Sequence, residues 1–422
     1  MQYLQPPANA NTHSTRTVIK NANQYNVFLK YVSVHSEDRN ISKFPNSGEF
    51  EIELPENYKN VQSVRLDSWT FPSNYSVFSP ILNNVSLTFK FTNAYNPSDH
   101  GVADPLLAAI FAGLANNYTN EYIAVIEPGF YTPDQMYVEL QNKLNNAVTN
   151  YLIDFFTNTP AYNYALATFT GYSRFIVMYN EVGQKLMFGN KADQFTLTND
   201  STFYKKENIN NDRCVRRAAL PEFINWGLPS FLGFTRNAAE ALSVAATLAQ
   251  NPLNTHIDRL NMLPRLFYGE PNTPGGDGYW IVPDPVLVGS QVYFLEAPLK
   301  INLMGPGYFY MEIDGFNCID ETSPYNLSTF TSTTNETNGV VNAAFAKIPI
   351  PSTPITQWFD NTSNSYKWFN PPMEKIRRLK VKIRYHNGDI VYFGAFDFSF
   401  MLEFTQLDPQ NLKTYSTAFS AN

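Results

Sequence analysis

The 422-residue sequence is poor in charge and in cysteine. Charged residues make up 16% of the chain, whereas about 25% is typical of soluble domains. Interface cores are depleted in charge and enriched in Tyr, Phe and Trp, so low charge combined with 15% aromatics is typical of a protein whose faces are covered by neighbouring copies. The only cysteines, Cys214 and Cys318, lie far apart and cannot make a disulfide framework. This cysteine usage favours a reducing, intracellular place of assembly.

Features that direct a chain to nucleic acid or into a membrane are also missing from the sequence. The net charge is −7 and there is no Lys/Arg-rich tail, so the clustered cations that neutralise a nucleic-acid backbone are absent. The opening residues, MQYLQPPANANTHSTR, have no apolar core and do not read as a signal peptide. The longest apolar stretch, Leu106–Ala115, has about half the length that a bilayer span needs. We expect a soluble protein, made in the cell interior, with no specific nucleic-acid partner.

The sequence contains no constellation typical of catalysis or of metal binding. The glycine-rich segment 275–278 lacks the strand, the Lys-Ser/Thr pair and the helix of a phosphate-binding loop. Glu37 and Asp38 could form an acid/base pair, but we favour a loop in which Asp38 and Arg39 hold backbone groups and pair with neighbouring charges. We expect no enzyme activity, no cofactor and no metal. The five histidines are scattered and no two have metal-ligand spacing: His13, His35, His100, His256 and His386.

Alternating apolar and polar residues predict β-strands in the first hundred residues. Phe50, Ile52 and Leu54 alternate with glutamates, so we expect one face of this strand to be buried against the core and the other to be exposed to solvent. We expect the strand to stop at Pro55. Further strands are expected at 27–34, 61–71 and 85–91.

Three helices are expected, the clearest of them near 132–150. Thr132 is a good N-cap, Pro133 suits the first helical position, and Gln135 completes a capping-box spacing. Alanine density predicts a second helix at 238–250, and a short third helix is predicted at 105–116. We interpret all three as short insertions in a β protein. One face of the first helix carries apolar residues four apart: Met136, Leu140, Leu144 and Val148.

The strongest pair of strands is predicted near the C-terminus, at 376–385 and 390–404. Asn387-Gly388 lies between them and is typical of a tight hairpin turn. We expect a hairpin over 376–404 in which a phenylalanine ladder faces a Leu/Val/Ile ladder in a sandwich core. The phenylalanine ladder consists of Phe396, Phe398, Phe400, Leu402 and Phe404. A further strand is predicted at 308–314.

The length predicts more than one region, because single hydrophobic cores stop growing at about 250–300 residues. We expect two β domains, or one with large insertions. The expected divisions are an extended arm at 1–24, a β-rich region at 25–225 containing the helical insertion, a second β-rich region at 226–405 containing the hairpin, and a C-terminal arm at 406–422.

Four cations share one face of the strand at 376–385: Arg378, Lys380, Lys382 and Arg384. Four aligned cations on one strand repel one another unless something compensates them. They form either a docking stripe for an acidic neighbour, lipid headgroups or nucleic acid, or a solvated outer face. Both interpretations stay open at this point, and the four residues are the candidate partner contact.

Three blocks of the sequence resemble a known family. The second block, 128–145, is a Gly-x-Tyr-Thr turn that leads into a helix, and the third combines 346–351 with 369–404. The first block, 36–75, contains Ser36, Asp38, Arg39, Pro45, Leu54-Pro55, Asn60-Val61 and Phe71-Pro72. This arrangement is similar to minor capsid and penton proteins of large icosahedral double-stranded DNA viruses of algae and protists. The blocks cover about a third of the chain, at both ends; residues 150–300 match no known pattern.

The resemblance implies an all-β fold, an antiparallel jelly-roll sandwich with one or two jelly rolls, and a structural role in a virion. The expected function is a minor capsid protein that connects or stabilises major capsomers, with the major capsid protein and other minor capsid proteins as partners. Many-copy or homo-oligomeric assembly and contact with an inner membrane surface are further expectations. The alternatives are a penton protein at the five-fold vertex and, from another class, a carbohydrate-binding or host-attachment sandwich.

Overall fold

The computed structural model describes thirteen stretches of the chain, and they form two compact units. One unit comprises Met1–Tyr75 and Pro306–Asn422, and the other comprises Ser76–Gly305. The expected division near residue 225 is therefore wrong, because both ends of the chain belong to one unit and the middle forms the other. The described stretches are 25–72, 77–92, 104–198, 227–235, 237–254, 256–266, 279–287, 289–322, 342–350, 357–360, 365–386 with 388, and 390–409.

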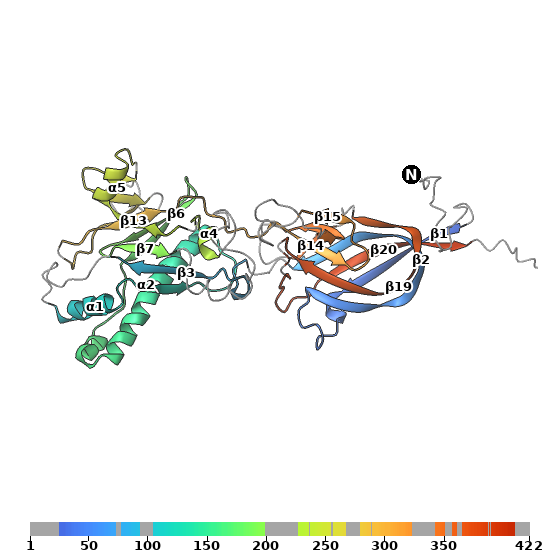
Figure 1. The fold of residues 1–422 in the computed structure, drawn as a ribbon, viewed down its shortest axis with the longest axis horizontal. Coiled ribbons are helices and arrows are strands. Elements are labelled where there is room, and N and C mark those ends of the chain that lie inside the picture. The colour runs from blue at the N-terminus through green and yellow to red at the C-terminus, as the bar shows by residue number, and fades with distance from the viewer. Residues whose placement is uncertain are drawn as a thin grey trace, which may run out of the picture. The chain divides into compact units, whose positions relative to one another are not determined.

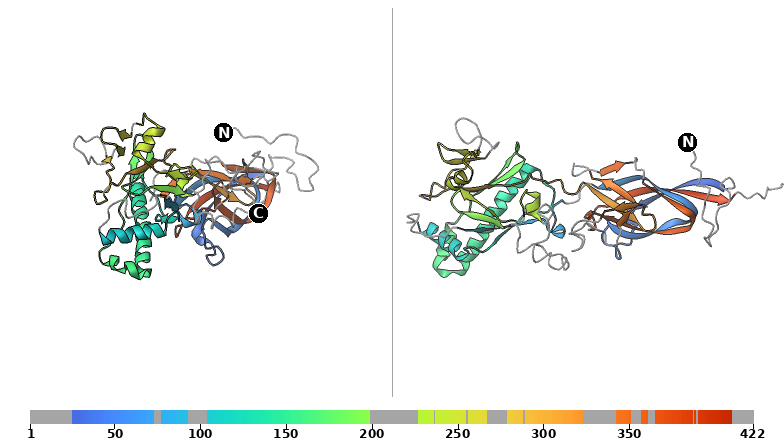
Figure 2. Two further views of the ribbon diagram at one scale, coloured as in Figure 1. Left: turned by 60° about the vertical axis from the view of Figure 1, so that its left-hand side comes forward. Right: turned by 45° about the horizontal axis from the view of Figure 1, so that its top comes forward.

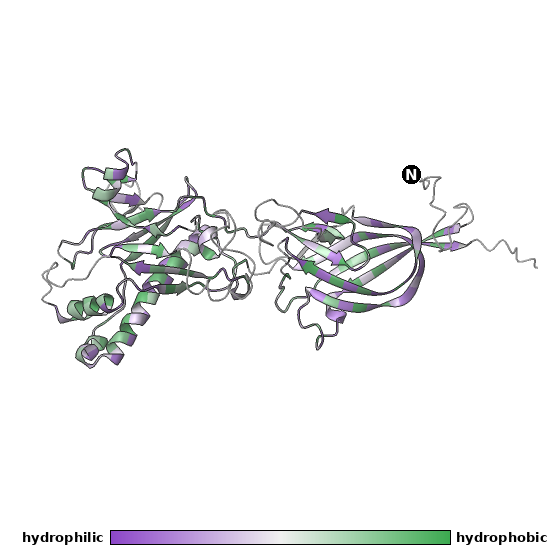
Figure 3. Ribbon diagram, in the orientation of Figure 1, coloured by the Kyte–Doolittle hydropathy of each residue, from purple (hydrophilic) through white to green (hydrophobic). Residues whose placement is uncertain are grey.

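The first unit is built on a seven-stranded antiparallel sheet in the order β1-β20-β2-β19-β14-β17, with β18 also paired to β2. Figure 1 shows the long strands curving around a common interior, and Figure 3 shows hydrophilic and hydrophobic residues alternating along them. A two-stranded sheet, β15 (Ile319–Glu321) with β16 (Asn342–Ala344), completes the unit. The strands of the large sheet are β1 (Tyr25–His35), β2 (Glu49–Pro72), β14 (Tyr308–Ile313), β17 (Ala346–Pro349), β18 (Gln357–Asp360), β19 (Tyr366–Arg384) and β20 (Ser399–Pro409).

The strand expected to stop at Pro55 continues to Pro72. Opposite β19 the register shifts between the pairs Arg378–Glu53 and Ile376–Tyr58. Pro55 lies in this irregular stretch, where its missing N–H costs no ladder hydrogen bond. The segments at 49–54 and 61–71 are consequently two parts of one strand.

The predicted hairpin over 376–404 is wrong, because β19 and β20 each pair with β2, which lies between them. The chain does reverse after β19, where Val391 N–H donates to the carbonyl of Ile383 at 3.0 Å, but only a single bridge forms before it leaves the sheet. Phe396 is exposed, whereas the rest of the ladder is buried as predicted: Phe398, Phe400, Leu402 and Phe404. Of the turn itself, Asn387 lies outside the described residues.

Phe71 lies at the centre of the aromatic core of the first unit. Its ring centroid is 4.6 Å from that of Phe398, 4.8 Å from that of Phe309 and 5.8 Å from that of Phe393. These rings come from β2, from the segment that precedes β20, and from β14. Large aromatic side chains that meet across a sheet contribute both buried area and ring contacts. The core therefore joins residues from opposite ends of the chain.

The second unit is a sandwich of two four-stranded antiparallel sheets, β4-β3-β7-β8 and β5-β6-β13-β9. Phe175 of β5 contacts Phe89 of β3 at 4.9 Å and Phe195 of β7 at 5.1 Å between ring centroids, which joins the two sheets. A small third sheet has the order β10-β11-β12. The strands are β3 (Ser86–Phe91), β4 (Tyr122–Val125), β5 (Phe175–Asn180), β6 (Lys185–Asn190), β7 (Phe195–Thr198), β8 (Ala239–Glu240), β9 (Leu242–Ser243), β10 (Ile257–Asp258), β11 (Leu263–Leu266), β12 (Tyr279–Trp280) and β13 (Tyr293–Glu296).

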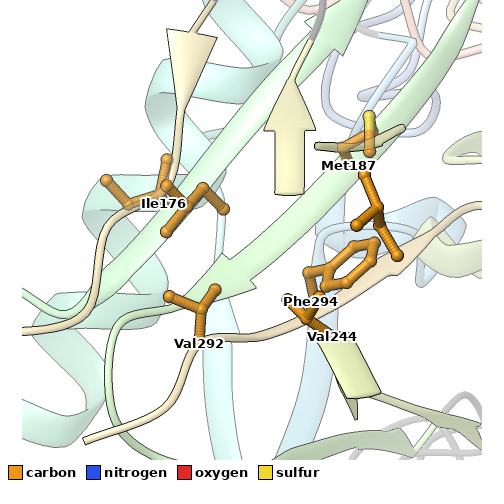
Figure 4. Packing of buried hydrophobic residues seen from close by; sticks show 7 residues of the cluster. Ile176, Met187, Val244, Val292 and Phe294 are labelled. Carbon is orange, nitrogen blue, oxygen red and sulfur yellow. The ribbon is translucent and has the colours of Figure 1, made fainter. Parts of the chain in front are cut away.

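The sheet β5-β6-β13-β9 is buried on both faces. Phe175 and Val177 point into the sandwich, and Ile176, one position apart, lies on the other face. There Ile176 packs in a second cluster with Met187 and Phe294, shown in Figure 4. The remaining buried members of this cluster are Val244, Ile257, Ile281 and Val292.

The helix predicted from Thr132 is confirmed and is longer than expected. α2 spans Pro133–Asn158, and both hydrogen bonds of the capping box between Thr132 and Gln135 are present. Its buried stripe includes the four predicted residues and continues to Leu152 and Phe156. Figure 2 shows α2 lying along the sheets of the second unit. The other helical segments are α1 (Pro105–Asn116), α4 (Leu228–Phe231), α5 (Val244–Gln250), and the 3-10 turns Ser36–Asp38, Pro80–Leu82 and Pro160–Ala167.

The helix predicted at 238–250 is correct only in its second half. Residues 239–243 form the short strands β8 and β9, which pair with β7 and β13. The alanine content favours helix locally, but two open strand edges next to this segment supply hydrogen bonds that it takes instead. Ser243 then caps α5 by accepting from Ala246 N–H.

The predicted class, an antiparallel all-β jelly-roll sandwich with helical insertions, is confirmed. One inserted helix, α2, is 26 residues long rather than short. The expected arm at 1–24 and residues 410–422 of the C-terminal arm lie outside the described residues. Residues 406–409 belong to β20.

Candidate interaction surface

The cationic stripe predicted on β19 lies opposite a row of glutamates. Arg378, Lys380 and Lys382 are paired in register with Glu53, Glu51 and Glu49 of β2, respectively. Directly opposed residues of an antiparallel pair project from the same face of the sheet. The compensation that four aligned cations require is therefore supplied within the chain.

Arg378 makes the shortest contacts of this charge ladder. Its guanidinium is 2.9 Å from a Glu51 oxygen and 3.0 Å from a Glu53 oxygen. Hydrogen bonds to Glu53 and Glu51 raise the pKa of Arg378, and the hydrogen bond from Arg378 lowers the pKa of Glu53. This part of the surface is exposed and carries charges of both signs, so it is not a uniformly basic stripe.

Arg384, the fourth predicted cation, is buried and is excluded from an exposed contact surface. Its guanidinium donates to Glu312 of β14 and to Glu321 of β15, and it lies over the ring of Tyr310 at 5.2 Å. Burial opposes the charge, but the hydrogen bonds and charges of both glutamates outweigh it and raise the pKa of Arg384. Arg384 holds the two sheets of the first unit together.

The polar cluster around Ser36 and Arg39 is a structural clamp. Arg39 donates to Asp397 at 2.5 Å, to the carbonyl of Ser36 at 2.7 Å and to the carbonyl of Phe44 at 3.0 Å. The Ser36 hydroxyl donates to the same Asp397 oxygen at 2.9 Å and accepts from Phe398 N–H. These bonds fix the loop after β1 to the start of β20. The preferred interpretation is confirmed for Arg39, which holds backbone groups and pairs with Asp397; for Asp38 it stays a prediction.

The Gly-x-Tyr-Thr turn of the second block anchors the start of α2. Gly129 exchanges two backbone hydrogen bonds with Phe78, at 2.9 and 3.0 Å. The Tyr131 hydroxyl donates to the carbonyl of Glu127 at 2.7 Å, and burial raises the pKa of Tyr131 to about 12. The turn is thus held on both sides before Thr132 caps the helix.

Sequence reasoning missed a mixed aromatic and polar face on the outer side of the large sheet. The pair registers place Tyr366, Arg65, Glu403 and Tyr31 in one row across β19, β2, β20 and β1. The next row contains Trp368, Ser63, Thr405 and Leu29. Trp368, Tyr366, Tyr31 and Leu29 are all about half exposed.

The polar centre of this outer face is internally paired. Arg65 donates to Glu403 at 2.8 Å and to Asp67 at 3.1 Å, and the Tyr31 hydroxyl donates to Glu403 at 2.8 Å. That hydrogen bond raises the pKa of Tyr31. The alternation Tyr-Lys-Trp-Phe at 366–369 is visible in the sequence, but only the strand register brings it beside β2 and β1.

The described residues contain no group of three or more His, Cys, Asp and Glu side chains arranged to hold a metal ion. Of the histidines, His35 contacts Ser33 and His386 contacts Glu321, while His13 and His100 lie outside the described residues. Among the described helices, none is both long and apolar enough to cross a bilayer.

Comparison with solved structures finds several similar chains. The chain is similar to the crystal structure of a selenomethionine-labelled penton protein of mavirus, with 8% identity and a TM-score of 0.37; the match covers 91% of this chain and 100% of that chain. At this TM-score the superposition carries no argument about topology or function. No family model and no curated protein matches the sequence.

Proposed function

We propose that this chain is a structural component of the capsid of a large double-stranded DNA virus, a minor capsid protein that connects or stabilises major capsomers. The observation that carries the proposal is the position of the blocks that resemble this family. The first and third blocks lie at opposite ends of the sequence, yet they supply β2, β19 and the start of β20, which are neighbours in one sheet. Their order and spacing therefore correspond to one folded unit rather than to scattered matches.

The blocks act within the fold and not as a catalytic site. Ser36 and Arg39 of the first block clamp Asp397 of the third, and Glu51 and Glu53 of the first pair with Arg378 of the third. A pattern whose residues hold strands together is what a shell protein needs, because its task is to keep a shape while neighbours bind around it. Major and minor capsid proteins are the proposed partners, and the virion is the proposed location.

Quantitative mass spectrometry of purified virions that encode this chain tests the proposal. We expect the chain in fixed stoichiometry with the major capsid protein, at well above about five copies per vertex. A fixed ratio of about five copies per vertex would replace the minor capsid role with the penton role. Absence from virions would refute both.

Trp368 and Tyr366 are the specific observation that favours the second candidate, a carbohydrate-binding or attachment sandwich. Both rings are exposed on the outer face of the sheet beside hydrogen-bonding side chains, an arrangement that offers one apolar surface and several polar contacts. Micromolar binding on a glycan array that is lost in Trp368→Ala would support this candidate. Lys30→Ala, which alters a different part of the surface, is the matched control.

The cations of β19 that reach the surface remain a proposed partner contact, reduced to the exposed Arg378 and Lys380 and the partly exposed Lys382. Reversal of Arg378 alone would also break its internal ion pairs, so the informative variant is the double swap Arg378→Glu with Glu53→Arg. The swap restores opposite charges at the directly opposed positions 378 and 53 but inverts the pattern that a partner meets there. We expect the swap to fold and to fail in virion incorporation; normal incorporation would show that the ladder serves the fold alone.

A further inference from the structure

The free edge of β1 is a second feature of the first unit that points outward. In the described part of the chain, β1 is paired on one side only, with β20, in an unbroken register from Tyr25–Pro409 to His35–Ser399 (Figure 1). An unpaired strand edge is a template for another chain, and proteins usually protect it with charges, prolines or a covering segment. Three successive outward positions of β1 instead carry large side chains with apolar surface: Val27, Leu29 and Tyr31 are 59%, 54% and 54% exposed.

A hydrogen bond just after the end of β1 shows toward which side the backbone groups of each β1 residue point. Ser36 N–H donates to the carbonyl of Phe398 at 2.8 Å, and these two residues continue the β1–β20 register. Backbone groups of an antiparallel strand alternate between its two sides. Even-numbered residues therefore face β20, and the N–H and C=O groups of Val27, Leu29 and Tyr31 face the free edge.

We propose that β1 pairs antiparallel with β1 of a second copy of this chain, across a two-fold axis at Leu29. The isologous contact makes one continuous sheet from two copies. It uses the backbone groups at the free edge and places Leu29 opposite Leu29, and Val27 opposite Tyr31, of the two copies. The exposed apolar row of one chain is thus continued by the same row of the other.

Side-chain parity and charge exclude two neighbouring registers. Outward residues must oppose outward residues, since a shift by one position would place apolar side chains on the wrong face. An axis at Lys30 would set two ammonium groups against each other, whereas the axis at Leu29 sets each Lys30 beside Phe28 of the other copy. A cation next to an aromatic ring is favourable, and two like charges opposite each other are not.

The pairing is independent of the proposed function, because it concerns the isolated chain. One strand pair buries less area than the about 1,200–2,000 Å² of a stable protein interface. We therefore expect a dimer with a dissociation constant in the micromolar range, measurable by sedimentation velocity over a concentration series. An assembled shell, where local concentration is high, would favour the same contact.

Cysteine cross-linking tests the register on the full chain with Cys214→Ser and Cys318→Ser. Opposed residues of a hydrogen-bonded antiparallel pair have Cα atoms about 5.5 Å apart, within the range of a disulfide. Leu29→Cys should give a covalent dimer under mild oxidation, and Tyr31→Cys, which faces Val27 of the other copy, should not. Equal cross-linking of both variants, or of neither, would overturn the proposed axis.

Leu29→Pro tests the edge itself. Proline removes an N–H that faces the free edge and leaves the ladder to β20 intact. Two symmetric hydrogen bonds are lost, so we expect the dissociation constant to rise about tenfold or more, while Leu29→Val should dimerise as the wild type does. A folded Leu29→Pro variant that dimerises normally, or a wild-type chain that stays monomeric throughout the series, would refute the pairing, whether or not the chain is found in virions.

Discussion

The edge strand β5 of the second unit and the edge strand β1 of the first unit differ in whether another element covers them. In the second unit, α2 covers the edge of β5: Gln141 accepts from Val177 N–H, and Asn145 bonds both the N–H and the carbonyl of Phe175. In the first unit, the edge of β1 presents exposed apolar side chains. Because covered edges cannot recruit a further strand and open ones can, the edge of β1 is suited to contacts with other chains and the edge of β5 is not.

The two units also differ in how their strands are connected. The second unit is formed by one continuous segment, whereas the first joins β1 and β2 to strands more than 200 residues further along. The middle of the chain is thus an insertion in the first unit. Closing so long a loop carries an entropic cost, and the clamp of Arg39 on Asp397 and the ion pairs of Arg384 are among the contacts that offset it.

The largest effect is expected for Arg384→Ala. The change leaves Glu321, which is buried, and Glu312 without their cation, and removal of one partner from a buried ion pair costs about 3–5 kcal/mol. We expect the free energy of unfolding of the first unit to fall by this amount and that of the second unit to stay unchanged. Hydrogen-exchange mass spectrometry, which follows peptides of each unit separately, measures both values.

Arg378→Ala is the matched control for that prediction. It removes a cation six residues before Arg384 on the same strand, but its ion pairs are exposed and exposed pairs contribute little. Protection in the first unit should therefore change far less than in Arg384→Ala. Equal losses in the two variants would mean that the buried cluster does not hold the unit together.

An intermediate effect is expected for Asn145→Ala in the second unit. The amide of Asn145 satisfies both backbone groups of Phe175 at the edge of β5. Unsatisfied, partly buried groups cost about 1–3 kcal/mol. Exchange protection of β5 should fall accordingly, while Asn146→Ala, an exposed neighbour on α2, leaves it unchanged. Loss of protection in the first unit instead would contradict the separation of the two units.

The features that depend on residues close together in the sequence were predicted correctly. The capping box at Thr132, the apolar stripe of α2 and the alternation at 398–404 depend on residues within one or two turns, and each is found in the structure. The same holds for the strand beginning at Glu49, apart from its end. Pro55 could not be recognised as a bulge residue, because the bulge exists only against β19.

The local sequence pattern does not determine which distant strands pair with each other. The segments at 376–384 and 399–404 have the right alternation and a turn between them, yet β2 pairs with both from more than 300 residues away. The charge ladder could not be predicted for the same reason. The glutamates at 49–53 and the cations at 378–382 are each evident in the sequence, but only the strand register shows that they compensate one another. Arg384 differs from its three neighbours because β14 and β15 cover it.

The smallest effect is expected in the pH dependence of the stability of the second unit. Burial and the neighbouring Asp193 raise the pKa of Tyr172 in the second unit well above its ordinary value; its hydroxyl donates to Asp193 at 2.5 Å. A raised pKa means that the folded state keeps the proton that the unfolded state releases near pH 10, so stability is fully present below pH 10 and is lost as the pH rises above it. We expect the second unit to lose about 1 kcal/mol per pH unit there through this residue. In Tyr172→Phe, exchange protection should be lower at neutral pH but should fall less steeply between pH 9 and 11; an unchanged slope would show that Tyr172 ionises as easily in the folded protein as in the unfolded chain.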